Sequence, residues 1–188
     1  MQKHLQKSQS SVERAKSRQR LFNRAVLLAT LIIIAVVAAY ALTRPQPVTL
    51  PSYLNYCIPL KGPFVYSEVF IVRIIVSGVE QTVPQYIGVV SRTCVRPIYT
   101  LTTSGGIHVD SPQDRTYTLG DVFLVWGSTY GEQYSTFNQN QLFVYKAGNG
   151  HSIGMTVNNQ TNTDFENYQL PRNANTQTNQ YNITITYT

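Results

Sequence analysis

The longest uncharged stretch of the chain constrains its fold most. Residues 25–42 read AVLLATLIIIAVVAAYAL and contain no charged side chain. A helix of this length, rising about 1.5 Å per residue, would be about 27 Å long, slightly short of the roughly 30 Å hydrocarbon core of a bilayer. Leu21 and Phe22 can extend it at one end, and Arg44 with Pro45 ends it at the other. The sequence therefore predicts one transmembrane helix over residues 25–42.

The distribution of charge predicts the direction of this helix. Residues 1–24 contain seven of the fifteen basic residues and one acidic residue, so this segment carries the whole formal net charge of +6. Basic residues flanking a membrane helix favour the cytoplasmic side. We therefore expect residues 1–24 to form a basic cytoplasmic tail and the following chain to lie outside the cell membrane. Because the rest of the chain has no excess of basic residues, nucleic-acid binding by the outer domain is not expected.

A cleavable signal peptide is the alternative interpretation of the apolar stretch. Ala39-Tyr40-Ala41 matches the A-x-A cleavage pattern. The apolar run is longer than the roughly 7–15 residues usual in signal peptides, which favours a signal anchor that stays in the membrane. Both interpretations export residues 45–188.

The two cysteines, Cys57 and Cys94, fall in the exported part of the chain. A pair of cysteines outside the cytosol predicts a disulfide, and closing a loop of this size should stabilise the fold by about 3–4 kcal/mol. A redox or metal pair is the alternative, but neither cysteine belongs to a CxxC motif. Asn159-Gln160-Thr161 and Asn182-Ile183-Thr184 are candidate glycosylation sequons, at Asn159 and Asn182, provided that the host modifies such sites.

Short apolar runs and turn residues predict an all-β domain over residues 56–188, after a Pro-rich stalk over residues 43–55. We expect a tight turn at Asn158-Asn159 and a short helical turn starting at Leu119. The expected strands are Val65–Val76, Tyr86–Arg92, Arg96–Leu101, Ile107–Asp110, Thr116–Thr118, Leu142–Ala147, Ile153–Val157 and Gln180–Tyr187. This pattern favours a sandwich or a small barrel, with a β-grasp-like unit as an option in the C-terminal part.

Few residues suggest chemistry. His108 and Asp110 lie two apart in an expected strand and should point to one face. Together with His151 they are the weak candidates for a copper or zinc site. The chain has no nucleophile elbow, phosphate loop or dinucleotide motif, so catalysis is not expected. Trp126 is surrounded by apolar residues, which favours a core position over a role in binding.

Six stretches of the exported part form a recognisable pattern: Gly62–Tyr66, Gln81–Gly88, Cys94–Thr100, Gly106–Pro112, Tyr117–Phe123 and Trp126-Gly127. Together they resemble a functionally uncharacterised family of membrane-anchored or secreted proteins of ammonia-oxidising archaea. The resemblance implies an extracytoplasmic domain and, in typical members, a histidine-rich constellation that suggests a metal site. This chain departs from that pattern. Where typical members have an H-x-H pair, this chain has the region of Tyr66 and Glu68. Where they have an H-T-H-D run, residues 99–102 of this chain read Tyr-Thr-Leu-Thr. Only His108 matches a family histidine.

The sequence therefore predicts a non-catalytic, single-pass membrane protein without a cofactor. Its outer domain would serve as a binding or structural module, and its partners would be the lipid bilayer and another envelope or membrane protein. The alternative is an extracytoplasmic copper- or zinc-binding protein centred on His108.

Overall fold

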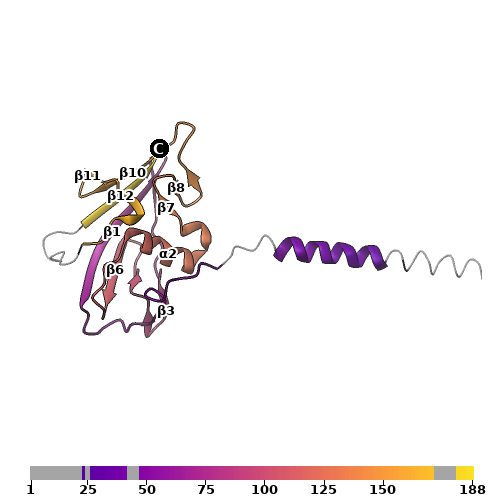
Figure 1. Cartoon of the computed structure of the whole chain (residues 1–188), viewed down its shortest axis with the longest axis horizontal. Helices are drawn as coiled ribbons and strands as arrows, with labels where there is room; N and C mark the ends of the chain where they lie inside the picture. The colour runs from indigo at the N-terminus through magenta and orange to yellow at the C-terminus, as the bar shows by residue number, and fades with distance from the viewer. Residues whose placement is uncertain (1–22, 24–25, 42–46, 172–180) are drawn as a thin grey trace, which may run out of the picture. The chain divides into compact units, whose positions relative to one another are not determined.

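The computed structural model describes residue 23 and residues 26–41, 47–171 and 181–188 (Figure 1). It divides into one unit up to Pro45 and a second unit over Gln46–Thr188. The described part of the first unit is a helix over residues 26–41, whose large apolar side chains are exposed. No helix within the described segments has the length and apolar character needed to span a bilayer.

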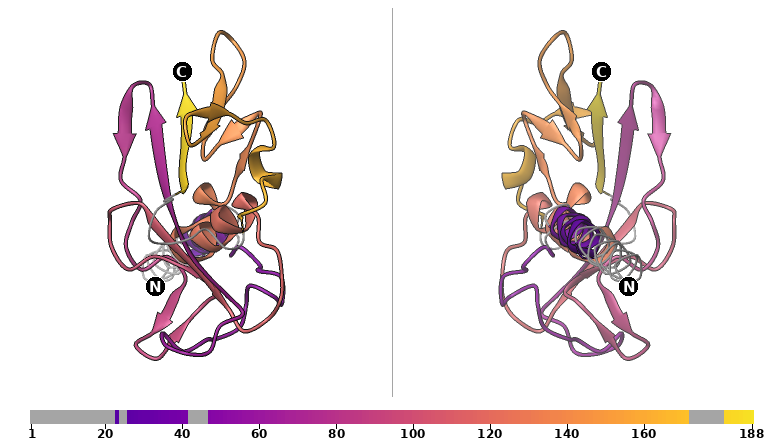
Figure 2. Two further views of the ribbon diagram at one scale, coloured as in Figure 1. Left: turned by 90° about the vertical axis from the view of Figure 1, so that its left-hand side faces the viewer. Right: turned by 90° about the vertical axis from the view of Figure 1, so that its right-hand side faces the viewer.

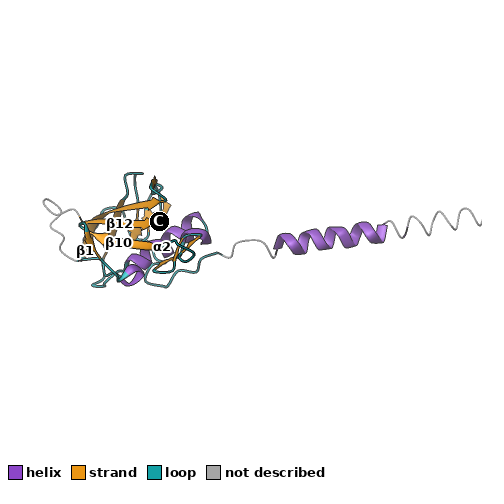
Figure 3. Ribbon diagram, turned by 90° about the horizontal axis from the view of Figure 1, so that it is seen from above, coloured by secondary structure: helices purple, strands orange, loops and turns teal. Residues whose placement is uncertain are grey.

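The second unit is built on a seven-stranded sheet with the order β11-β10-β12-β1-β6-β5, and β2 pairs with β1 off this path. Figure 3 labels β1, β10 and β12 of this sheet and shows strands in orange and helices, including α2, in purple. The first long strand and the last strand, β1 and β12, lie side by side in parallel, while the other pairs in this sheet are antiparallel. The strands are β1 (Tyr66–Val76), β2 (Val79–Gln81), β5 (Ile98–Tyr99), β6 (Gly106–Ser111), β10 (Ile153–Val157), β11 (Gln160–Thr161) and β12 (Tyr181–Tyr187).

Two small sheets and three helical segments complete the unit (Figure 2). The small sheets have the orders β3-β4 and β7-β8-β9. Their strands are β3 (Val89–Ser91), β4 (Cys94–Val95), β7 (Phe137–Asn138), β8 (Gln141–Leu142) and β9 (Tyr145–Lys146). The helical segments are α2 (Leu119–Tyr130) and the 3-10 helices η1 (Glu132–Tyr134) and η2 (Phe165–Asn167).

Alternation along β1 determines which face of the sheet becomes the core. Every second side chain from Tyr66 to Val76 is buried, and the residues between them are exposed or half-buried. Across the parallel pair, Val72 lies beside Ile183 and Ile74 beside Ile185, so both strands bury the same face. A shift of one residue would expose this whole apolar set, which is why the pattern determines the register.

Helix α2 packs into the same core. Its start is a capping box, in which the Thr118 hydroxyl accepts from the Asp121 N–H and the Asp121 carboxylate accepts from the Thr118 N–H. Val122, Phe123 and Trp126 are buried in the main core cluster together with the inner face of the sheet. The cap explains why a complete helix over Leu119–Tyr130 replaces the short turn expected from the sequence.

The prediction of a β-rich fold is confirmed, but the prediction of a small closed barrel is wrong. The large sheet is open, because its path ends at β11 on one side and at β5 on the other. The inner face of the sheet shares its core with α2, Phe137 and Leu142. One helix and a three-stranded sheet therefore contribute the apolar surface that a second large sheet would supply in a sandwich.

The predicted Pro-rich stalk also differs from the structure. Leu50 and Leu54 are buried in the main core cluster, and Val48 and Tyr53 pack against it. The folded unit therefore starts well before residue 56, and residues 43–46 of the predicted stalk lie outside the described segments. Apolar side chains spaced between the prolines attach this segment to the domain.

Several predicted strands are shorter or absent. Tyr86–Arg92 is reduced to β3, since Tyr86 has a positive φ of 66° in a turn. The stretch 116–118 contains no strand; Thr118 instead caps α2 and forms an isolated bridge with Gln169. Leu142–Ala147 is divided into β8 and β9 by a turn at Phe143, where φ is 55°.

Two predictions near the C-terminus hold. The Asn158-Asn159 turn is confirmed, because both residues have positive φ and connect β10 to β11. The last predicted strand is confirmed as β12, and residue 180, where it was expected to start, lies outside the described residues.

Candidate functional site

The predicted disulfide between Cys57 and Cys94 is present, with the two Cα atoms 5.1 Å apart. Next to it, Ile58 and Val95 exchange backbone hydrogen bonds of 2.8 and 3.0 Å. The disulfide therefore ties the segment that precedes β1 to the small β3-β4 sheet.

The predicted pair His108 and Asp110 lies on one face of β6, with Tyr99 from the neighbouring strand β5. The Tyr99 and His108 rings stack with centroids 5.0 Å apart and an interplanar angle of 11°. The Tyr99 hydroxyl donates a 2.6 Å hydrogen bond to the Asp110 carboxylate. Burial and this hydrogen bond raise the pKa of Tyr99. Burial lowers the pKa of His108, and the charge of Asp110 offsets part of this effect.

The third candidate, His151, lies elsewhere. Its ring stacks on Tyr187 with centroids 5.1 Å apart. Tyr187 pairs with Val76 near the end of β1, whereas His108 pairs with Val69. Seven residues along a strand separate these positions by about 23 Å at roughly 3.3 Å per residue. His108 and His151 therefore do not converge, and no metal-binding group of three or more His, Cys, Asp or Glu side chains occurs in the described part of the chain.

The positions at which the family pattern carries histidines are divided between the two faces of the sheet. Tyr66 and Glu68 face the core from β1. Val109 pairs with Glu68 and therefore lies on the same face as Glu68. His108, the neighbour of Val109 in the strand, points to the opposite face, where it stacks on its pairing partner Tyr99. This arrangement does not assemble these positions into one site in this chain.

The two sequons have different environments. Asn159 is exposed in the β10–β11 turn, with φ of 66°. Asn182 lies within β12, where its backbone N–H and C=O bond the side chain and backbone of Asn158. Both asparagines are exposed, but Asn159 lies in a turn, whereas the backbone of Asn182 is hydrogen-bonded within a strand.

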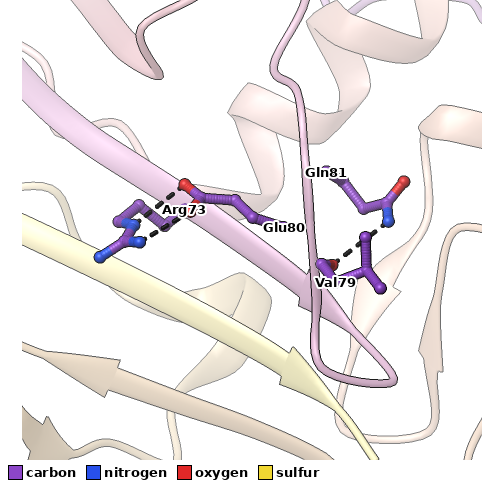
Figure 4. Close-up of polar contacts among 4 residues, drawn as sticks. All are labelled: Arg73, Val79, Glu80 and Gln81. Carbon is purple, nitrogen blue, oxygen red and sulfur yellow. Dashed lines mark hydrogen bonds and ion pairs between the residues drawn. The ribbon is translucent and has the colours of Figure 1, made fainter.

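A polar cavity of about 340 Å³ lies between β6 and β2, which both pair with β1. On the β6 side the Val72 N–H donates to the Gly105 carbonyl, and on the β2 side Ile74 pairs with Gln81. Thr82, Thr103 and Ser104 line it with hydroxyl groups, together with Glu80 and Gln81. Glu80 is held by two hydrogen bonds of 2.7 and 3.0 Å from Arg73, and Figure 4 shows the Gln81 side chain pointing away from this ion pair.

A second cavity, of about 230 Å³, adjoins the first and shares Gln81 and Thr82 with it. Its aromatic residues are Trp126 of α2, Tyr134 of η1, and Phe143 and Tyr145 of the β7-β8-β9 sheet. Gln133 and Val144 complete the lining. We call this space the aromatic cavity. Its residues come from four segments, and Gln81 and Thr82 lie more than forty residues before the others, so only the fold brings them together.

The aromatic side chains pack against one another. The Trp126 and Tyr134 rings are stacked at 5.6 Å with an angle of 8°. Phe143 meets both edge-on, at 5.1 and 5.3 Å. Trp126 is only 3% exposed, as the sequence predicted, and its indole N–H has no hydrogen-bond partner among the described residues. A buried donor without an acceptor costs free energy.

The aromatic cavity was not predicted from the sequence, which favours only a core position for Trp126. The signal that was available is the density of tyrosine and phenylalanine between Tyr130 and Tyr145, beside glutamines. That composition does not distinguish a core from the wall of a cavity.

Comparisons with protein-family models, with curated proteins and with solved structures each found no match.

Proposed function

We propose that this chain is a single-pass membrane protein whose C-terminal domain lies outside the cell and acts as a non-catalytic binding module beside an envelope complex. The observation that carries the proposal is the pair of adjoining cavities around Gln81 and Thr82. We call the two cavities together the recess; it is lined by hydroxyl, amide and aromatic groups. The domain that contains it is cross-linked by a disulfide. Concave sites with a few polar groups among apolar walls are typical of binding sites.

The anchor is supported by the sequence and by exposure. The basic residues of segment 1–24 precede the uncharged stretch, which matches the orientation in which the tail is cytoplasmic. Along the helix, Leu31, Ile32 and Ile33 are 54–63% exposed. Contiguous exposed apolar surface of this kind marks contact with a membrane or a protein. The lipid bilayer is the partner that we propose for it.

We infer a β-grasp-like arrangement for the domain. The hairpin β1–β2, the helix α2, and β12 lying parallel beside β1 follow one another in the order of that topology. It extends over most of the second unit rather than the C-terminal part alone. The long central strands provide a rigid support for the short elements that line the two cavities.

The His108 cluster supports a structural role rather than catalysis or metal binding. The Asp110 carboxylate accepts from Tyr99, and the His108 ring is covered by the same tyrosine. The Asp110 carboxylate and the His108 ring therefore both contact Tyr99 of the neighbouring strand. His151, which would have to join a metal site, is stacked on Tyr187 at a different position.

Three experiments on cells and membranes test the proposal. Protease added to intact cells should degrade the C-terminal domain, and Cys57 and Cys94 should be disulfide-bonded in freshly isolated membranes. A protected domain, or free thiols, would contradict the proposed location. Affinity purification of the full chain from solubilised membranes should recover an envelope partner.

A matched pair of variants assigns that interaction to the recess. Gln81→Ala, in both cavities, should reduce recovery of the partner. Thr184→Ala should leave recovery of the partner unchanged, because Thr184 lies on the face of β12 that points away from the core. Recovery of the chain always alone, or equal loss with both variants, would contradict a binding role for the recess.

A further inference from the structure

We infer that the aromatic cavity binds one ring of a neutral saccharide. This inference rests on the proposed binding function and names the chemical class of the ligand. The residues that line the cavity are all uncharged. Of the two acidic residues next to the lining in the sequence, Glu80 points away from Gln81 and is paired with Arg73 (Figure 4), and Glu132 is exposed. A charged ligand would lose its hydration without gaining a counter-ion.

The cavity combines aromatic and amide groups. A pyranose ring has faces of C–H bonds, which pack on the electron-rich faces of aromatic rings. Tyr134 is half-buried and Tyr145 is 37% exposed, so both rings are accessible at the cavity, while Trp126 and Phe143 are buried behind them. This arrangement provides an apolar wall for the ring and leaves one side open.

The hydroxyl groups of a sugar require donors and acceptors at the rim. Gln81 and Gln133 each have one acceptor and two donors, and Thr82 adds a hydroxyl. In this structure the Gln81 amide donates to the Val79 carbonyl at 3.3 Å and the Gln133 amide to the Tyr130 carbonyl at 3.4 Å. Both hydrogen bonds are long, so exchanging them for bonds to a ligand costs little.

The local backbone holds these groups in place. Phe143 has a φ of 55°, which is unfavourable for a bulky residue, and strain of this kind persists where the surrounding packing imposes it. Gly131 has a φ of 117°, and a Cβ there would collide with the Gln133 side-chain amide. The glycine therefore allows the position of Gln133 at the rim.

The size of the recess favours a short chain of sugars over one large ligand. The aromatic cavity, at about 230 Å³, is smaller than the roughly 300–1,000 Å³ typical of sites for drug-sized molecules. The adjoining polar cavity, lined by Thr103 and Ser104, offers hydroxyl groups to a second unit. A proline-rich peptide is the competing ligand for an aromatic surface, but it would leave these hydroxyl and amide groups without partners.

The chain contains a single tryptophan, and it lies in this cavity. Its fluorescence therefore reports binding at this position without a label. We would titrate the full chain, in a detergent without a sugar head group, with glucose, mannose, N-acetylglucosamine and maltotriose. The expected result is a saturable change in Trp126 emission for at least one of these probes. Glucuronic acid and glucosamine, the charged counterparts of glucose, should bind at least about tenfold more weakly.

Variants complete the test. Gln81→Ala and Tyr145→Ala should each weaken the binding of the responding sugar by about tenfold or more. Tyr86→Ala removes a tyrosine that is 52% exposed outside the cavity and should leave binding unchanged. No fluorescence response to any neutral probe up to about 50 mM, a range that includes weak sites, would overturn the inference. A response to a polyproline peptide alone, equal binding of charged sugars, or no effect of Gln81→Ala and Tyr145→Ala would also overturn it.

These outcomes are separable from those of the proposed function. If the domain is protease-accessible and Gln81→Ala reduces partner recovery, but neutral sugars do not bind, only the ligand class is wrong. If the domain is protected in intact cells, the proposed function fails whatever the fluorescence shows.

Discussion

The hydroxyl of Tyr53 donates a 2.8 Å hydrogen bond to the carboxylate of Asp121. Tyr53 belongs to the segment that follows the N-terminal unit, and Asp121 is the third residue of α2 and the partner of Thr118 in its capping box. The second carboxylate oxygen of Asp121 accepts from the Thr118 N–H at 2.9 Å. The Arg115 guanidinium lies 3.4 Å from the centre of the Tyr53 ring. One carboxylate thus joins the start of the domain to its main helix.

This relationship predicts an order of stability losses. Tyr53→Phe removes one hydrogen bond and should lower the free energy of unfolding by about 0.5–1.5 kcal/mol. Asp121→Ala removes the same bond and half of the capping box, so it should cost more, about 1–3 kcal/mol. Urea unfolding followed by Trp126 fluorescence measures both. Thr118→Ala is the control for the cap alone, and an Asp121→Ala loss no larger than that of Tyr53→Phe would contradict the shared role of the carboxylate.

The disulfide predicts a larger effect. Replacing Cys57 and Cys94 together with alanine opens a loop of 37 residues, and the free energy of unfolding should fall by about 3–4 kcal/mol. Reduction of the unaltered chain should produce a similar loss in the same urea assay, while the double variant should not respond to reductant. A double variant as stable as the oxidised chain would show that the link is dispensable.

Local patterns predicted the long elements of this fold and missed those that depend on distant contacts. A run rich in β-branched residues that ends at Gly78 was sufficient for β1, and alternation was sufficient for β12, because strands of seven or more residues carry their own signal. The strands around Phe143 were too short to show a period. Leu54 was assigned to a stalk because the prolines around it suggested an extended linker, whereas its apolar side chain fills the core.

The candidate sites show the same limit. The shared face of His108 and Asp110 followed from their spacing alone, since residues two apart in a strand point the same way. The stacking of Tyr99 on His108 depends on the β5–β6 register. Nothing in the sequence indicated it. The aromatic cavity depends on Gln81 and Tyr134 meeting across more than fifty residues of chain, which no local pattern specifies.

The environments of the two sequons predict which asparagine is modified in a glycosylating host. Asn159 is exposed in a two-residue turn, while Asn182 is fixed in β12 by its bonds to Asn158. We expect a glycan on Asn159 and none on Asn182. Intact-mass measurement should show one glycan, lost in Asn159→Gln and retained in Asn182→Gln. Loss of the glycan in the second variant alone would reverse the assignment.

The dispersed histidines predict a negative result in metal analysis. Because His108 and His151 lie at separate positions and Asp110 is bonded to Tyr99, we expect the purified full chain to contain less than one equivalent of copper or zinc. His108→Ala should not change that content. Stoichiometric metal that is lost in His108→Ala, measured by elemental analysis, would instead support the metal-binding alternative.

The half-buried imidazole of His108 predicts how stability depends on pH. Its pKa in the folded state is lowered, because burial disfavours the charged ring more than Asp110 favours it. The unfolded chain, with an ordinary pKa of about 6.5, then binds a proton more readily than the folded chain. The free energy of unfolding should therefore be fully retained above about pH 6.5 and fall as the pH drops below it.

The His108→Gln variant isolates this contribution. It cannot gain the proton, so its urea midpoint should fall less between pH 7.5 and pH 5 than that of the unaltered chain. His151→Gln is the matched control, because His151 is an exposed histidine stacked on a tyrosine in the same way. If His108→Gln and the unaltered chain lose stability in parallel over this range, the prediction is wrong. The surroundings of His108 in the folded state would then not disfavour the charged imidazole.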